Sequence, residues 1–242
     1  IVFSSDWHLG SIATNYKVFK QNIEYLIETK DLYMVVVGDT IDNFLQFPDK
    51  SAVLAQVLNP PYQKKMLKSI IDELIGNGKI IATGWGDHDS RFEEKLSGSD
   101  VIRTLTANRI PYFPGKGVLK MTVGKQDYTC SVTHKSRFNS YINETHGSSQ
   151  EYRTFIPADI CVTGHLHSPA FSVCHRLPIA REAGMKCGGQ VILIRTGSYK
   201  QTDIYSMRFW NAGVIGTPTV VMYGDQWKLM PFATAEDAVS YM

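Results

Sequence analysis

The chain has 242 residues, of which 43% are apolar and 11% aromatic, a composition typical of a globular protein with a sizeable core. Its 25 Lys and Arg residues and 23 Asp and Glu residues leave a net charge of +2, which argues against a nucleic-acid binder built on a basic tail. The longest apolar runs, residues 34–37 and 191–194, are far shorter than the roughly 20 residues that cross a bilayer.

The cysteines and the start of the chain indicate the cellular setting. Four widely spaced cysteines without a CxxC pair are typical of reduced thiols rather than of a disulfide framework or a zinc knuckle. They are Cys130, Cys161, Cys174 and Cys187. Ile1 opens inside an apolar run without an initiator Met, so we expect a few residues to precede it. No signal peptide is visible, and we expect a cytoplasmic protein without membrane contact.

The first half of the chain alternates apolar strands with amphipathic helices. Strands are predicted at residues 1–4, 32–37 and 79–83, where β-branched and apolar residues run together. Between them, apolar residues at helical spacing predict helices over residues 16–29 and 61–75. This order favours parallel strands joined by crossover helices.

The second half of the chain, after Ile110, is rich in strands. A hairpin is expected at residues 124–127, between strands at residues 118–123 and 128–132. Further strands are predicted at residues 160–162, 191–195 and 219–222. Because no internal repeat or low-complexity linker divides the chain, we expect one α/β domain with two sheets over residues 1–242.

Acidic and imidazole side chains follow most of the predicted strands. They are Asp6, His8, Asp39, Asp42, Asp87, His88 and Asp89 in the first half, and His134, His165 and His167 in the second. The carboxyl ends of strands in an α/β sheet converge on one crevice, so these side chains are expected to become neighbours. A single residue of this kind is usually a cap or a turn residue, but the joint placement of the whole set predicts a metal site. Carboxylates with imidazoles and no thiolate suit Mn, Fe, Zn, Ni or Co.

Asp39 is the candidate for a ligand shared by two ions. Divalent ions in dinuclear centres lie about 3.5–4 Å apart and repel each other, so a shared carboxylate must bridge them. Asp39 follows Gly38 in a tight turn in the middle of the set.

The order of these motifs resembles that of the calcineurin-like metallophosphoesterases. The resemblance is carried by Asp6-x-His8, Gly38-Asp39-x-x-Asp42, Gly86-Asp87-His88-Asp89, His134 and Gly164-His165-Leu166-His167, and it runs to about Ser198. The opening Ser5-Asp6-Trp7-His8-Leu9-Gly10 is also similar to that of SbcD-type nucleases. The resemblance implies an α/β four-layer sandwich of two mixed sheets flanked by helices, with a dinuclear metal site at the strand ends.

The resemblance also implies which residues hold the two divalent ions, for which Mn is favoured and Fe, Zn, Ni or Co are alternatives. The first ion would be held by Asp6, His8, Asp39 and His167, and the second by Asp39, Asp87, His134 and His165. His88 would be unligated and act as a general acid, or as a donor to the developing charge, with Asp89 orienting it. Asp42 would hydrogen-bond the ligands from outside.

Two positions depart from the pattern of the resembling family. Asp87 stands where the family has Asn, and Lys135 follows His134 where the family commonly has Gly. The carboxylate of Asp87 adds a negative charge beside the ions and lacks an amide donor, so we expect it to slow the reaction. Lys135, Arg137 and Arg91 are candidates for contacts with substrate phosphates, although each taken alone is more readily a solvated surface charge.

The function that the resemblance implies is hydrolysis of a phosphoester by a hydroxide that bridges two metals. The SbcD-like opening and the nearby basic residues favour phosphodiester cleavage, with nucleic acid or a nucleotide as substrate. The near-neutral charge and the short chain argue against a nuclease with a DNA-capping domain. Two alternatives stay open. One is hydrolysis of a phosphomonoester or a phosphoprotein, and the other is a catalytically weakened metal-binding scaffold, against which the retention of His88 and Asp89 argues.

Overall fold

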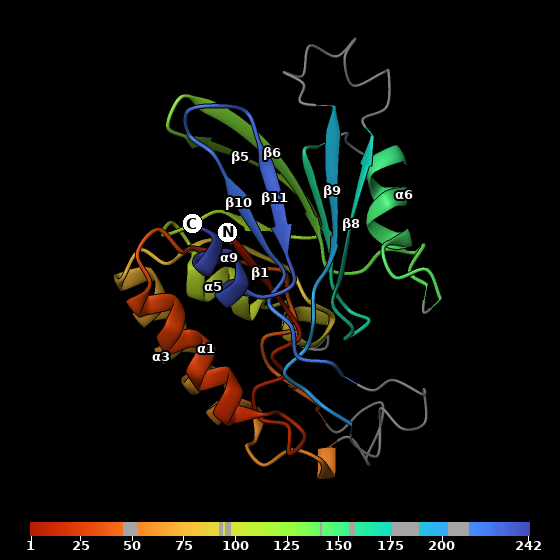
Figure 1. Cartoon of the computed structure of the whole chain (residues 1–242). Coiled ribbons are helices and arrows are strands. Elements are labelled where there is room, and N and C mark those ends of the chain that lie inside the picture. The colour runs from red at the N-terminus through yellow and green to blue at the C-terminus, as the bar shows by residue number, and fades with distance from the viewer. Residues whose placement is uncertain are drawn as a thin grey trace.

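The structure of the protein is a computed structural model in which two β-sheets pack face to face with helices on both outer faces (Figure 1). It describes residues 1–45, 53–91, 94, 98–140, 142–154, 158–175, 189–202 and 213–242. Both sheets contain parallel and antiparallel pairs, so the chain forms the four-layer α/β sandwich of mixed sheets that the sequence predicts.

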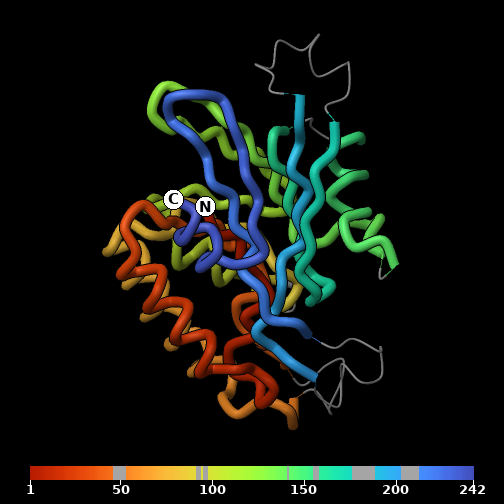
Figure 2. Tube along the Cα trace, in the orientation of Figure 1, coloured from red at the N-terminus to blue at the C-terminus, as the bar shows by residue number. Residues whose placement is uncertain are grey.

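The first sheet has six strands in the order β11-β10-β1-β2-β3-β4. They are β1 (Val2–Ser4), β2 (Met34–Val36), β3 (Ile80–Gly84), β4 (Tyr112–Phe113), β10 (Thr219–Met222) and β11 (Leu229–Phe232). The parallel pairing of β1, β2 and β3 confirms the prediction, with helices α1 (Tyr16–Glu28) and α3 (Pro60–Gly76) as the crossovers. The hairpin β10–β11, blue in Figure 2, extends the sheet beyond β1.

The second sheet has five strands in the order β5-β6-β7-β9-β8. They are β5 (Lys116–Val123), β6 (Gln126–Thr133), β7 (Ile160–Thr163), β8 (Ala170–His175) and β9 (Gln190–Arg195). The predicted hairpin joins β5 and β6, but its turn is tighter than expected because Gln126 and Asp127 already pair with β5. Strands β6, β7 and β9 run parallel, and β8 was not predicted.

The remaining helices are short, and the sequence did not predict them. Helices α5 (Val101–Thr106) and α9 (Ala235–Tyr241) contact the first sheet, and α6 (His146–Thr154) covers the second. A single π-helical turn, η1 (Asp87–Arg91), follows β3. In the part of the chain that the structure describes, no helix has the length and apolar character needed to span a membrane.

The side chains of the central strands alternate between two cores. Val2, Met34 and Val36 pack against the helices, whereas Phe3, Val35 and Val37 pack against the second sheet. Burial on both faces explains why these strands read as continuous apolar runs in the sequence. A third, smaller core lies under α6.

The cysteines of the second sheet lie in different cores. Cys130 is a buried free thiol between the sheets, and Cys161 is a buried free thiol in the core under α6. Cys187 lies outside the described residues, as does the side chain of Arg91.

Candidate metal centre

The carboxyl ends of β1, β2, β3, β6 and β7 meet at one end of the sandwich and bring the predicted ligands together. Ligand atoms gather within 4.8 Å of one another in three groups: Asp6, His8 and His167; Asp39, His134 and His165; and His8, Asp39 and His88. The first two groups each contain three of the four residues that the resemblance implies for one ion. Asp39 is not in the first group, and the third group connects it to His8. Among the described residues, Asp87 belongs to none of the three groups.

The turns that leave these strands have left-handed backbone conformations. Positive φ angles occur at Asp6 (53°), His8 (46°), Asp39 (52°), His165 (75°) and His167 (57°). Each costs about 1–3 kcal/mol in a residue other than glycine and persists only where the surroundings fix it. Hydrogen bonds between the first two turns do so, since the His8 amide donates to the Asp39 carbonyl at 3.1 Å. Glycine is required at position 38, because a Cβ there would lie 2.4 Å from the carbonyl oxygen of Trp85.

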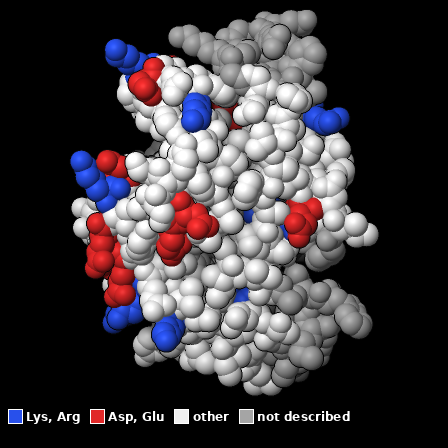
Figure 3. All heavy atoms as spheres, viewed as in Figure 1, with Lys and Arg blue, Asp and Glu red and all other residues white. Residues whose placement is uncertain are grey.

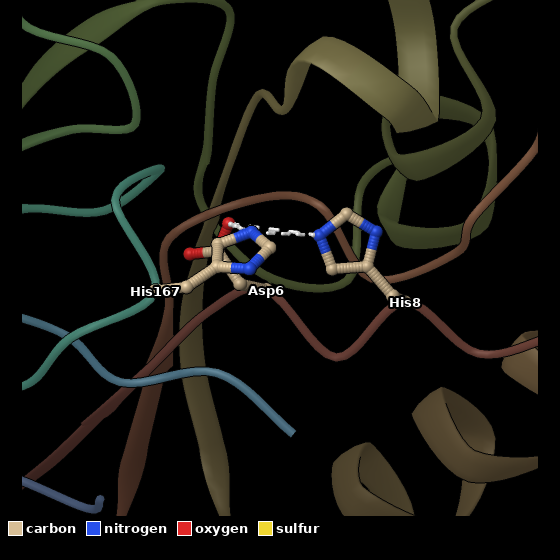
Figure 4. A group of neighbouring side chains, drawn as sticks. All are labelled: Asp6, His8 and His167. Atoms are coloured by element: carbon tan, nitrogen blue, oxygen red, sulfur yellow. Dashed lines mark hydrogen bonds and ion pairs between the residues drawn. The ribbon is translucent and has the colours of Figure 1, made fainter. Parts of the chain in front are cut away.

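The first ligand group consists of Asp6, His8 and His167 (Figure 4). Nδ1 of His8 lies 3.1 Å from a carboxylate oxygen of Asp42, so it carries the proton and leaves the Nε2 lone pair facing inward. That Nε2 is 3.1 Å from Nε2 of His167, which in turn is 3.2 Å from Oδ1 of Asp6. Ligand atoms about 2.1 Å from one ion lie roughly 3.0–3.4 Å from each other, so this spacing suits a shared ion.

The second ligand group is built around a contact between His134 and Asp39. Nδ1 of His134 donates to the carbonyl oxygen of Val37 at 2.7 Å, so its Nε2 lone pair faces Oδ2 of Asp39 at 2.9 Å. Two acceptors at this distance require a cation between them. Burial lowers the pKa of His134, but the charge of Asp39 and its hydrogen bond outweigh burial and raise the pKa to about 10. A divalent ion would take the place of that proton.

The buried polar atoms of both groups fit divalent ions. Oδ1 of Asp6 and Nε2 of His134 are buried, and their polar neighbours are other ligand atoms: Nε2 of His167 at 3.2 Å and Oδ2 of Asp39 at 2.9 Å. Such contacts between lone pairs need a proton or a metal ion between them. The pKa of His165 is lowered to about 4 by burial and by the charge of His134, so its imidazole is neutral and able to bind a metal. These imidazoles and carboxylates are the donor set that Mn, Fe, Zn, Ni or Co prefers.

His88 lies beside the shared carboxylate. Its backbone amide donates to Oδ1 of Asp39 at 2.8 Å, and its Nδ1 donates to the carbonyl oxygen of Asp42 at 2.7 Å. Its ring packs edge-on against Phe44, with centroids 4.8 Å apart. Burial is the main cause that lowers the pKa of His88. The sequence predicted an unligated His88, whereas the structure places it within reach of a ligand set with His8 and Asp39.

Asp89 has a different position from the one predicted. Its Oδ1 accepts hydrogen bonds from the amides of Thr40 at 2.8 Å and Ile41 at 3.0 Å, and from the Thr40 hydroxyl at 2.8 Å. Successive residues of a helical turn do not face the same way, so Asp89 points at the turn after Asp39 while the Asp42 carbonyl orients His88. Burial and the neighbouring charge of Asp39 raise the pKa of Asp89 to about 7.

Two buried basic residues that sequence reasoning missed stabilise the ligand loops. Lys200, 3% exposed, donates at 2.8 Å to the same Asp42 oxygen that accepts from His8. Arg195, 1% exposed, donates to the carbonyl oxygens of Ser168 at 2.6 Å and Ser140 at 2.8 Å. It thereby ties together the loops that follow β6 and β7. The only feature of the sequence that could have indicated a role for Arg195 and Lys200 is their position just before and just after Thr196-Gly197-Ser198.

The three basic residues predicted to contact substrate phosphates have different surroundings. Lys135 pairs with Asp87, its Nζ 2.9 Å from Oδ2, and the same oxygen is 4.0 Å from Nδ1 of His165. Arg137 is exposed, with its guanidinium carbon 4.6 Å from the centroid of the Phe138 ring. The side chain of Arg91 is outside the described part.

Comparison with known proteins gives the class of the fold. No protein-family model matches the sequence, and no curated protein does. A single mutant of Vps29 from Entamoeba histolytica superposes with a TM-score of 0.50 at 11% identity, covering 97% of this chain and 92% of that chain. Also similar are Vacuolar Protein Sorting 29 from Cryptosporidium parvum (TM-score 0.42, 14% identity, 96% and 97% covered) and nuclease MPE from Pseudomonas putida (TM-score 0.39, 11% identity, 95% and 86% covered). The chain thus has the calcineurin-like sandwich fold, and at this identity the likeness establishes the fold alone.

Lys200→Met should lower the free energy of unfolding by about 3 kcal/mol, because the buried carboxylate of Asp42 loses its ammonium partner. Guanidinium unfolding of the metal-free protein measures this. Lys20→Met, which removes an exposed pair with Glu24, is the control and should have little effect. Equal losses in the two variants would show that the buried pair contributes no more than a surface pair.

Metal titration should find two ions per chain, and Asp39→Ala should lose both, because Asp39 belongs to the second ligand group and also gathers with His8 of the first. Asp6→Ala and His165→Ala should each lose one. Calorimetry with Mn²⁺ and elemental analysis after desalting measure the stoichiometry, with the exposed His175→Ala as control. A single ion in the unmodified protein would contradict the dinuclear arrangement.

Proposed function

We propose that the protein is a metal-dependent phosphoester hydrolase, with a phosphodiester in nucleic acid or a nucleotide as its substrate. The observation that carries the proposal is that two groups of carboxylates and imidazoles are connected where His8 of the first meets Asp39 of the second, with His88 beside them. A protein that only needed a folded sandwich would gain nothing from burying carboxylates such as Asp6 against imidazoles.

The residues have distinct tasks in this proposal. Asp6, His8 and His167 would hold one divalent ion, His134 and His165 the other, and Asp39 would be shared. When bound, the ions would lower the pKa of a water molecule and offset the charge of the phosphate. These six residues would therefore fix the place where attack on phosphorus occurs.

His88 would serve the leaving oxygen. Because Nδ1–H is committed to the Asp42 carbonyl, His88 would act on the substrate through Nε2, which gives a proton or a hydrogen bond only from the doubly protonated imidazolium. The amide of His88 holds Oδ1 of Asp39, so the imidazole and the shared ligand are positioned by one residue.

The surface bears on the choice of substrate. On the face shown in Figure 3, basic and acidic side chains are interspersed and form no continuous basic stripe. Together with the net charge of +2, this favours a short strand or a nucleotide over a long duplex held by its phosphates. The likeness to Vps29, a sorting protein by name, keeps a metal-binding scaffold as the second candidate, since the same fold can serve either.

Turnover of bis-p-nitrophenyl phosphate with Mn²⁺ should exceed that of p-nitrophenyl phosphate, and Asp39→Ala should abolish both. The diester is the substrate class proposed, and Asp39 links the ligand groups. Initial rates at saturating Mn²⁺ give the comparison. Faster hydrolysis of the monoester would favour the phosphomonoesterase alternative, and metal binding without turnover of either ester would favour the scaffold.

His88→Ala should cut kcat/KM by about 10²–10⁴ while the ion count stays unchanged, because the variant loses the donor to the leaving oxygen. The loss should be smaller for a nitrophenolate leaving group, which needs no proton, than for the alkoxide of a dinucleotide. Rates on both substrates and metal analysis test this, with His146→Ala, in α6, as control. Loss of an ion in His88→Ala would instead make His88 a ligand.

A further inference from the structure

An ion pair stands at the edge of the second ligand group. Lys135 directly follows the buried His134, and its Nζ donates to Oδ2 of Asp87 at 2.9 Å. The Lys135 side chain is 44% exposed, whereas that of Asp87 is 10% exposed. The pair therefore connects a nearly buried carboxylate with an ammonium group that solvent and solutes can reach.

Asp87 is set apart from the atoms that gather for a metal. Atoms of Asp39, His134 and His165 lie within 4.8 Å of one another, but no Asp87 oxygen completes that set among the described residues. Oδ2 of Asp87 is 4.0 Å from Nδ1 of His165 in that group. Its Oδ2 is 1.1 Å closer to Lys135, so the ammonium is the nearer cationic partner of this carboxylate.

Building on the proposed function, we propose that Lys135 is a phosphate-binding residue of this site and that Asp87 is its anchor. A lysine ammonium has three N–H donors, and the contact with Asp87 uses one. The others can bind a non-bridging phosphate oxygen next to the second ligand group. The anchor reduces the rotamer freedom that a long exposed lysine loses when it binds an anion.

This assignment replaces the expectation that Asp87 slows the reaction. The sequence alone shows an extra negative charge beside the ions, but in the structure that charge is paired with the ammonium of Lys135. The pair is neutral as a unit, so the carboxylate does not by itself repel an incoming phosphate. The Asp87 carboxylate should weaken phosphate binding only when Lys135 is removed and Asp87 is left facing the substrate.

The test is binding of inorganic phosphate to the Mn²⁺-loaded protein, followed by calorimetry together with the ion count. Lys135→Ala should weaken phosphate binding by about 10- to 100-fold, the usual worth of a charge-assisted hydrogen bond, and Lys135→Arg should stay within a few-fold of the unmodified protein. Adding Asp87→Ala to Lys135→Ala should recover part of the loss. Asp87→Ala alone should keep both ions.

A second lysine–aspartate pair, on the β5–β6 hairpin, serves as a matched control. Nζ of Lys120 lies 3.0 Å from Oδ2 of Asp127. Lys120→Ala should leave phosphate binding unchanged. Unchanged affinity in Lys135→Ala, or an ion lost in Asp87→Ala, would overturn the proposal. Neither the phosphate affinity nor the ion count depends on turnover. Lys135-dependent phosphate binding without ester hydrolysis would therefore refute the proposed function and leave this inference standing.

Discussion

Four carboxylates are buried together at one end of the sandwich, and their charges have to be balanced without water. Asp6, Asp39, Asp42 and Asp89 are each at most 1% exposed. Two of them are balanced within the protein. Lys200 pairs with Asp42, and Asp89, crowded by the charge of Asp39, has a pKa raised to about 7 and can hold a proton. The charges of Asp6 and Asp39 have to be balanced by the neighbouring histidines or by ions that these histidines hold. This need explains most of the side chains that surround the two carboxylates.

Two of the histidines balance these charges with the same ring orientation. His8 and His134 each donate Nδ1–H to an oxygen behind them, of Asp42 and of the Val37 backbone, and turn the Nε2 lone pair toward a carboxylate. This is the orientation of metal-binding histidines in proteins, where an outer hydrogen bond selects the tautomer. Burial lowers the pKa of His8, but hydrogen bonds to Asp42 and Asp6 outweigh it and raise the pKa to about 9. Protons can thus fill the positions that divalent ions would occupy.

The sequence predicts the parts of this centre that follow from strand geometry. Asp6, Asp39, His134 and His165 each come just after an apolar run, and the carboxyl ends of such strands must converge. The left-handed turns at Asp6, Asp39 and His165 leave no mark in the sequence pattern apart from glycines such as Gly38. The short strands β4, β8 and β11 escaped prediction because runs of two to six residues carry too little periodicity.

What the sequence could not supply is the pairing of charges. Lys200 and Arg195 look like ordinary surface residues until the fold buries them against Asp42 and the loop carbonyls. Asp87 and Lys135 are separated by 48 positions, so the pair that neutralises them is invisible in a linear reading. The role of a single charged residue can be inferred only when its partner in the fold is known.

The central claim is that Asp39 joins two ions in one centre. Crystals of the protein grown with Mn²⁺, measured by anomalous scattering at the manganese edge, test it most directly. The account predicts two anomalous peaks about 3.5–4 Å apart, both in contact with the Asp39 carboxylate. One peak alone, or two peaks of which only one touches Asp39, would contradict it.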